Sequence, residues 1–146
     1  MSAENKIIVD RFYREVLNQR KLAVADELFS PNHMQHDPST PGLPPGPRGI
    51  KELISVYHIG FPDAVWTVEE IIDAGDRIVV RWTGSGTQNG PLPGIPPTAK
   101  RVTVPGIWIH RLSGGKIAES WTVWDTLGML QQLGRVPTEA ASRAAG

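Results

Sequence analysis

The sequence predicts a single α+β domain in which helices come before an antiparallel sheet. Apolar residues recur at helical spacing in the first part of the chain, and segments rich in β-branched and aromatic residues follow, separated by glycine-containing turns. Helices segregated from a run of strands indicate α+β and not alternating βαβ units. A curved sheet with helices over one face would form a cone with an open mouth. With 146 residues and no visible repeat or linker, we expect one domain over residues 1–137 and a flexible tail over 138–146.

The elements follow in order from the residue pattern. Apolar spacing predicts helices at residues 4–18, 22–29, 46–60 and 127–133. Strand composition predicts an antiparallel meander of four strands at residues 65–73, 77–83, 101–112 and 116–125. Residues 33–37 are interpreted as a short extended piece. The two stretches rich in Pro and Gly, 41–49 and 90–97, are expected to be ordered loops because they cannot continue a helix or a central strand.

Composition excludes several classes of protein. The chain has no cysteine, which rules out disulfides, thiolate catalysis and cysteine-ligated metals. Its 15 Lys and Arg balance 15 Asp and Glu, which argues against nucleic acid or an anionic membrane as the main partner. No apolar run reaches the length of a membrane span, and no glycine motif matches a nucleotide-binding loop. We therefore expect a soluble, cytoplasmic protein.

Asp125 is the first candidate for chemistry because it ends the run Trp121-Thr122-Val123-Trp124-Asp125. On a strand, Trp121, Val123 and Asp125 share one face. If that face lines the cone, the carboxylate lies among apolar walls, a setting that suits a general acid or base. The alternative is equally open, because Asp is a favoured helix N-cap and a short helix is expected next.

Two histidines are candidates to assist Asp125. His110 shares a strand face with Trp108, and the hairpin at Gly114-Gly115 is expected to bring it near the level of Asp125, where the pair could relay a proton. A histidine hydrogen-bonded within the sheet is the alternative. His33 and His36 would point to opposite sides of an extended segment, which argues against a shared metal, and His36 is the one expected to reach into the cone.

Aromatic side chains are the expected walls of an apolar pocket, although core packing would also account for them. The candidate substrate-binding residues are Phe12, Tyr57, Trp82, Trp108 and Trp121.

The opposite face of the sheet is predicted to be apolar as well. It would carry Val79, Ile107, Ile109 and Trp124. Such a surface is too apolar to be left in water, so we expect a homodimer, or a larger homo-oligomer, to bury it.

Several motifs together resemble the SnoaL-like polyketide cyclases of the nuclear transport factor 2-like superfamily. They are His36-Asp37-Pro38, Gly86-Thr87 with Gly90, Gly94 to Thr98, and the ending Trp121-x-x-Trp124-Asp125-x-Leu127-Gly128-x-Leu130-x-Gln132-Leu133-Gly134. The resemblance covers about residues 4–134. It implies a cone-shaped α+β barrel and an intramolecular aldol condensation that closes a ring without a metal or cofactor. The substrate would be a small hydrophobic or aromatic carbonyl compound.

The resemblance places the catalytic aspartate at Asp125, with His110 and His36 as groups that position it or the substrate. Two alternatives remain open, because this fold hosts many activities. An isomerase or a hydrolase would use the same acid–base site. A hydrolase is the less expected of the two, because Arg81 faces away from the side of the strand that carries Trp82 and no second buried Asp is evident. A non-catalytic module would only bind a hydrophobic ligand. An Asp125 that is exposed and bonded to the amides of the following helix would favour the module.

Overall fold

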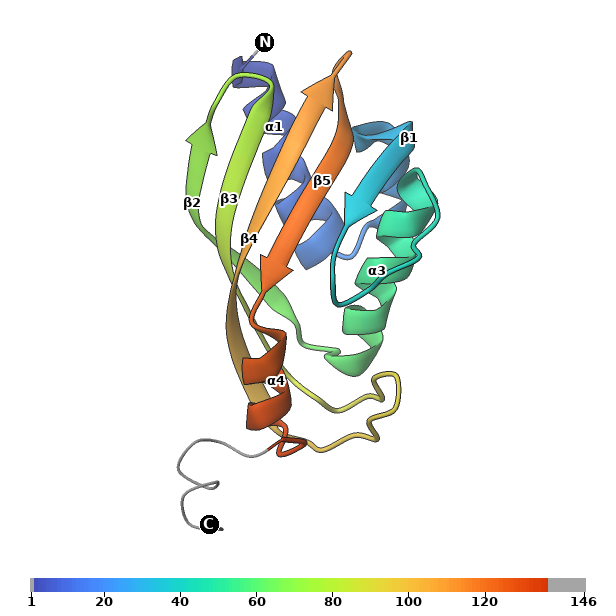
Figure 1. Cartoon of the computed structure of the whole chain (residues 1–146), viewed down its shortest axis with the longest axis vertical. Coiled ribbons are helices and arrows are strands. Elements are labelled where there is room, and N and C mark those ends of the chain that lie inside the picture. The colour runs from blue at the N-terminus through green and yellow to red at the C-terminus, as the bar shows by residue number, and fades with distance from the viewer. Residues whose placement is uncertain (1, 137–146) are drawn as a thin grey trace.

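The computed structural model describes residues 2–136 and shows helices packed against one face of a curved sheet (Figure 1). The expected tail over 138–146 lies outside the described residues. The helical segments are α1 (Ser2–Arg11), its π-helical continuation η1 (Phe12–Asn18), the 3-10 turn η2 (Leu22–Val24), α2 (Ala25–Leu28), α3 (Pro47–Gly60) and α4 (Thr126–Gln132). The strands are β1 (Phe29–His36), β2 (Val65–Asp73), β3 (Arg77–Thr87), β4 (Arg101–Ser113) and β5 (Lys116–Trp124). The predicted α+β class is confirmed.

The sheet has five strands in the order β1-β5-β4-β3-β2. Strands β2 to β5 form the predicted antiparallel meander. The prediction of a four-stranded sheet is wrong, because residues 29–36 form β1, which pairs parallel to β5 at one edge. The run from Phe29 to His36 contains Pro31 and several polar residues, so it lacks a clear strand pattern and is a typical edge strand.

The inner face of the sheet holds the core together with the N-terminal helix. Along β3, Ile78, Val80 and Trp82 are buried while the residues between them are less so, as expected for a strand with one face covered. The helical segment α1–η1 buries Phe12 and Val16 against this face. Burying a side chain of this size stabilises the fold by about 1.5–3 kcal/mol. The helices and the sheet therefore enclose a cone whose inner wall is apolar.

Hydrogen bonds hold both loops rich in Pro and Gly in place. Gly46, with a φ of 80°, donates its N–H to the carbonyl of His33, and any Cβ there would meet the carbonyl oxygen of Pro31 at 2.6 Å. The side chain of the buried Gln88 bonds to Ile95, Pro96 and Thr98 in the second loop. These bonds satisfy backbone groups outside the regular helix and sheet ladders. The expectation that the whole of 41–49 is a loop is wrong, because α3 begins at Pro47.

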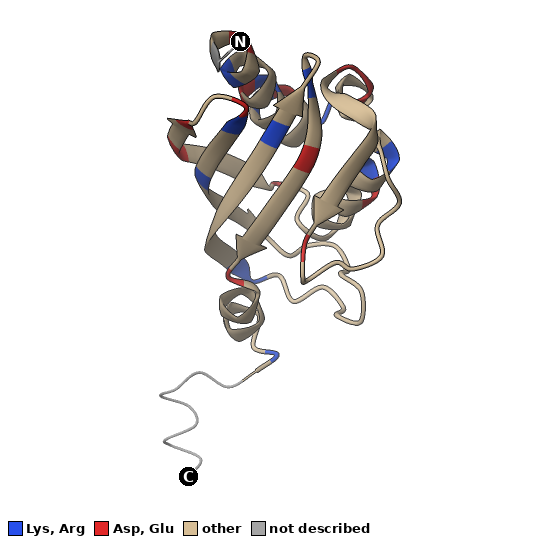
Figure 2. Cartoon of the chain, turned by 45° about the horizontal axis from the view of Figure 1, so that its top comes forward, with Lys and Arg blue, Asp and Glu red and all other residues tan. Residues whose placement is uncertain are grey.

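The outer face of the sheet is not covered by any helix of the described chain (Figure 1). Val79, Ile107 and Ile109 lie on it, as predicted. The placement of Trp124 there is wrong, because its ring packs edge-on against Tyr57 on the inner side. A few basic and acidic positions are scattered among the uncharged residues of this face (Figure 2). Within residues 2–136, no helix is long and apolar enough to cross a membrane.

Candidate active site

A pocket opens between α3 and the inner face of the sheet. Most of its lining is aliphatic or aromatic, which suits a hydrophobic ligand. Its aromatic residues are Tyr57, Phe61, Trp66, Trp82, Trp108 and Trp124. The placement of Tyr57, Trp82 and Trp108 in this lining agrees with the expected pocket walls.

Asp37 is the one charged side chain that lines the pocket among the residues the structure describes. It follows β1 directly and is 7% exposed. Its Oδ1 accepts hydrogen bonds from the backbone N–H of Ser39 at 2.8 Å and from the Ser39 hydroxyl at 2.6 Å, an Asx turn that holds the carboxylate in place. Its Oδ2 is buried and has no hydrogen-bond partner. One oxygen is thus anchored and the other has no hydrogen-bond partner among the described residues.

Buried polar atoms without a hydrogen-bond partner are concentrated at this pocket. Within residues 2–136, such side-chain atoms belong to Gln35, Asp37, Trp82 and Trp108, and the last three line the pocket. Buried polar groups are normally paired, so unpaired ones call for an explanation. Ordered water or a ligand in the pocket can supply such partners.

A chain of hydrogen bonds runs through the core behind the pocket. The hydroxyl of Tyr13 lies 3.1 Å from Nε2 of His110, whose Nδ1 lies 2.9 Å from Oγ of Ser120. The same Oγ lies 2.9 Å from Nε2 of His33. Each of these three contacts needs one hydrogen, so all three can be hydrogen bonds while both imidazoles are neutral. Burial lowers the pKa of His110 to about 3 and that of His33 to about 4, while it raises the pKa of the Tyr13 hydroxyl well above its usual range.

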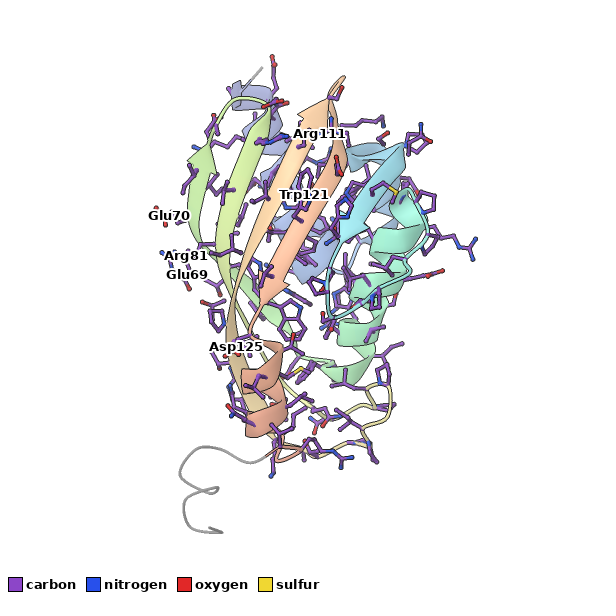
Figure 3. All side chains as sticks on the ribbon, viewed as in Figure 1. Glu69, Glu70, Arg81, Arg111, Trp121 and Asp125 are labelled. Carbon is purple, nitrogen blue, oxygen red and sulfur yellow. The ribbon has the colours of Figure 1, made fainter. Side chains whose placement is uncertain are left out.

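Asp125 lies at the junction of β5 and α4, outside the pocket (Figure 3). Its side chain is exposed and caps α4 by accepting the N–H of Gly128 at 2.8 Å. The expectation that Trp121, Val123 and Asp125 form an inward face is wrong, since Val123 is 69% exposed. The catalytic role of Asp125 stays a prediction, and its geometry is that of the helix cap.

The inner face of β5 carries polar residues instead of these apolar ones. Ser120 and Thr122 are buried there because their hydroxyls are paired, Ser120 with the two histidines and Thr122 with the carbonyl of Ile107. Buried hydroxyls with partners cost little. His110 is indeed on the inner face, but it lies opposite Ser120, well before Asp125 along β5. The expected approach of His110 to Asp125 is therefore wrong.

His36 and Trp121 are on the outer face of the sheet, so their expected places inside the cone are wrong. The two rings stack at a centroid distance of 5.4 Å, and Nε2 of His36 lies 2.7 Å from Oε2 of Glu119. The guanidinium of Arg77 lies over the Trp121 ring, with its Cζ 5.6 Å from the ring centre, a cation–π contact. It is His33, not His36, that points inward.

Phe12 is fully buried but does not line the pocket. Its ring packs edge-on against Trp108, with a centroid distance of 5.1 Å. It therefore supports a pocket wall from behind.

Residues 7–133 match the family model of the SnoaL-like polyketide cyclases. The chain belongs to the SnoaL-like polyketide cyclase family. Among curated protein sequences, no match to the chain is found.

Solved structures agree with this membership. TsrD from Streptomyces laurentii is 28% identical to this SnoaL-like protein, with a TM-score of 0.82 over 92% of this chain and 97% of TsrD. A protein from Jannaschia sp. CCS1, assigned to the SnoaL-like polyketide cyclases, is 26% identical, with a TM-score of 0.81 over 92% of this chain and 94% of its own. A Catenulispora acidiphila protein with a ketosteroid isomerase-like fold is 16% identical, with a TM-score of 0.73 over 87% and 92% of the two chains. The last likeness shows the fold alone, the nuclear transport factor 2-like cone.

Sequence reasoning about this SnoaL-like protein missed Asp37, His33 and Trp66 as inward-facing residues. A signal for two of them was present, because His33, Gln35 and Asp37 alternate along one strand and its continuation. Trp66 is placed by Asn18, whose side-chain amide accepts the Trp66 N–H and donates to the Trp66 carbonyl, both at 2.8 Å. Over residues 2–136, no group of three or more His, Asp or Glu side chains is arranged to hold a metal ion.

Proposed function

We propose that this protein catalyses proton transfer on a hydrophobic carbonyl compound, leading to aldol-type ring closure within one molecule. The observation that carries the proposal is Asp37, a lone carboxylate in the lining of an apolar pocket, with Oδ1 anchored and Oδ2 free. A general base must reach the proton that it removes, and Asp37 satisfies this condition for a ligand in the pocket, whereas Asp125 lies outside it. Membership in the polyketide cyclase family supports an enzymatic role.

The reaction follows from the position of Asp37. Its Oδ2 accepts a proton from the carbon next to a carbonyl group, and the electron pair of that C–H bond becomes the double bond of an enolate. The enolate carbon attacks a second carbonyl carbon of the same molecule. A C–C bond forms, the electron pair of the second C=O moves to its oxygen, and Asp37 returns the proton there. The walls contribute by orienting the two carbons and by excluding water.

The test is proton exchange and ring closure by the full chain in D2O. We expect the protein to accelerate deuterium incorporation into the methyl group of 2-acetylnaphthalene, followed by proton NMR, and to convert 1-phenylhexane-1,5-dione into its six-membered aldol product. Exchange without ring closure would instead support an isomerase, which shares the first step. Binding of both compounds without exchange would contradict the proposal and favour a non-catalytic binding module.

Self-association through the outer sheet face is a second proposal. Ile107 and Val123 are exposed on this face, and a second copy would bury them. We expect the wild type to sediment as a dimer and Val123→Asp as a monomer, since two-fold symmetry brings the new charges into one interface. Leu127→Asp, an equally apolar and exposed position on α4, is the matched control and should remain dimeric. A monomeric wild type would contradict this proposal.

A further inference from the structure

Two unpaired donors lie in the same pocket as the free oxygen of Asp37. The indole Nε1 atoms of Trp82 and Trp108 are buried and have no hydrogen-bond partner among the described residues. An indole N–H can only donate, so each needs an acceptor. Leaving such a group buried and unpaired destabilises the folded chain, and a bound acceptor removes this cost. The residues that line the pocket therefore include two donors and one acceptor without partners.

Trp82 on β3 and Trp108 on β4 lie on the same face of two neighbouring strands, diagonally across the strand pair. Trp82 on β3 pairs with Gly106 on β4, and a Cβ at Gly106 would lie 2.2 Å from Cζ2 and 2.4 Å from Cε2 of the Trp82 ring. Only glycine allows this ring to lie flat across β4. The six-membered part of the Trp82 ring therefore lies over the backbone of β4 at Gly106. Trp108 is two residues further along the same face of β4.

Packing from behind holds Trp108 in one orientation. The ring of His110 stacks on it at a centroid distance of 5.2 Å with an interplanar angle of 28°, and Phe12 and Tyr13 pack edge-on against it at 5.1 and 6.1 Å. The chain from Tyr13 to His33 in turn fixes His110. Donors whose direction is set before the ligand arrives stabilise developing charge without reorganisation.

The charge of the lining narrows the ligand class. No Lys, Arg or His lines the pocket among the described residues, and the one charged side chain there is the Asp37 carboxylate. A ligand anion would lose its hydration without gaining a counter-ion, and it would be repelled by Asp37. The pocket therefore suits an uncharged ligand with an acceptor oxygen.

We infer that the indole N–H groups of Trp82 and Trp108 bind the carbonyl oxygen of an uncharged aromatic carbonyl substrate and stabilise its enolate. The inference rests on the proposed function, because the enolate that the two N–H groups stabilise is the one that Asp37 forms. When the C–H proton passes to Asp37, the carbonyl π electrons move to the oxygen, and the two N–H groups donate to the resulting oxyanion. Both tryptophans are thereby catalytic residues as well as pocket walls.

The test compares two ligands of nearly equal shape on the wild-type chain. Nitrogen-15 NMR resolves the indole N–H resonances, which backbone and side-chain experiments assign to the individual tryptophans. We expect 2-acetylnaphthalene to move the Trp82 and Trp108 resonances downfield, the signature of new hydrogen bonds. We expect 2-isopropenylnaphthalene, which carries CH2 in place of the carbonyl oxygen, to leave only the smaller shifts of a nearby ring. Trp121, on the outer face, is the internal control and should stay in place with both ligands.

The outcomes separate this inference from the proposed function. Equal shifts with the two ligands, or no shift of either pocket resonance with the ketone, would overturn the role of the indoles even if proton exchange is observed. Downfield shifts with the ketone but no exchange would overturn the role of Asp37 alone.

Trp82→Phe should lower the exchange rate about 10²-fold, the usual effect of removing one oxyanion donor. It should weaken binding of the ketone, but not of the hydrocarbon, by roughly threefold to tenfold.

Discussion

Asp37→Asn is expected to lower the rate of ketone proton exchange by about 10³-fold, within the range attributed to a positioned general base. The carboxamide oxygen can still accept both bonds from Ser39, so the turn after β1 should survive. The position of Oδ2 would then carry an amide nitrogen, which cannot accept a proton. Exchange kinetics, together with calorimetric binding of 2-acetylnaphthalene, would show a loss of rate with the affinity largely kept.

Asp125→Asn is the matched control for this prediction. Asn is as good an N-cap as Asp, so α4 should keep its bond to the N–H of Gly128 and the free energy of unfolding should change little. The exchange rate should stay within about twofold of the wild type, because Asp125 does not line the pocket. The opposite pattern, an inert Asp125→Asn and an active Asp37→Asn, would restore Asp125 as the base and refute the proposed site.

Acidification is expected to destabilise the protein well before its carboxylates are protonated. The pKa values of His110 and His33 in the folded state are about 3 and about 4, below the ordinary value of 6.5. Between pH 6.5 and these values the unfolded chain binds more protons than the folded one, so stability falls as pH falls and is unaffected by these groups above pH 6.5. Each histidine contributes about 1.4 kcal/mol per pH unit in this window. From pH 6.5 to 5 the two should together remove about 3 kcal/mol, because the unfolded histidines are only half protonated at pH 6.5, and this is a large share of the stability of a typical domain.

Urea unfolding at several pH values measures this loss. The acidic side chains whose pKa is lowered, such as Glu15 beside Arg11 and Glu119 beside His36, lose stability only at more acidic pH and so fall outside the window. His110→Gln should be less stable than the wild type at pH 7 but have a smaller slope between pH 6 and 5, to which His33 and His58, whose pKa values burial also lowers, still contribute. A wild-type stability that is flat from pH 6.5 to 5 would show that the two imidazoles are not buried and neutral.

Local pattern was enough to predict the helices, the four-stranded meander and both loops of this protein. The hairpin signals at Gly75 and Gly114-Gly115 determine which strands are neighbours, since short turns join only antiparallel pairs. The segregation of helices from strands then leaves few folds to choose from. These features depend on residues close together in the chain, which is why they could be predicted without coordinates.

Pairing between distant segments was decided only by the tertiary structure. β1 joins β5 across most of the chain, and no local signal indicates that partner. This pairing brings His33 to Ser120 and places Asp37 at the pocket. It also buries hydroxyls on β5 and leaves Trp121 and Val123 outside, against the rule that apolar residues are buried. The rule fails there because each buried polar group has a partner on another strand, and a partner contributed by a distant segment is invisible in the local sequence.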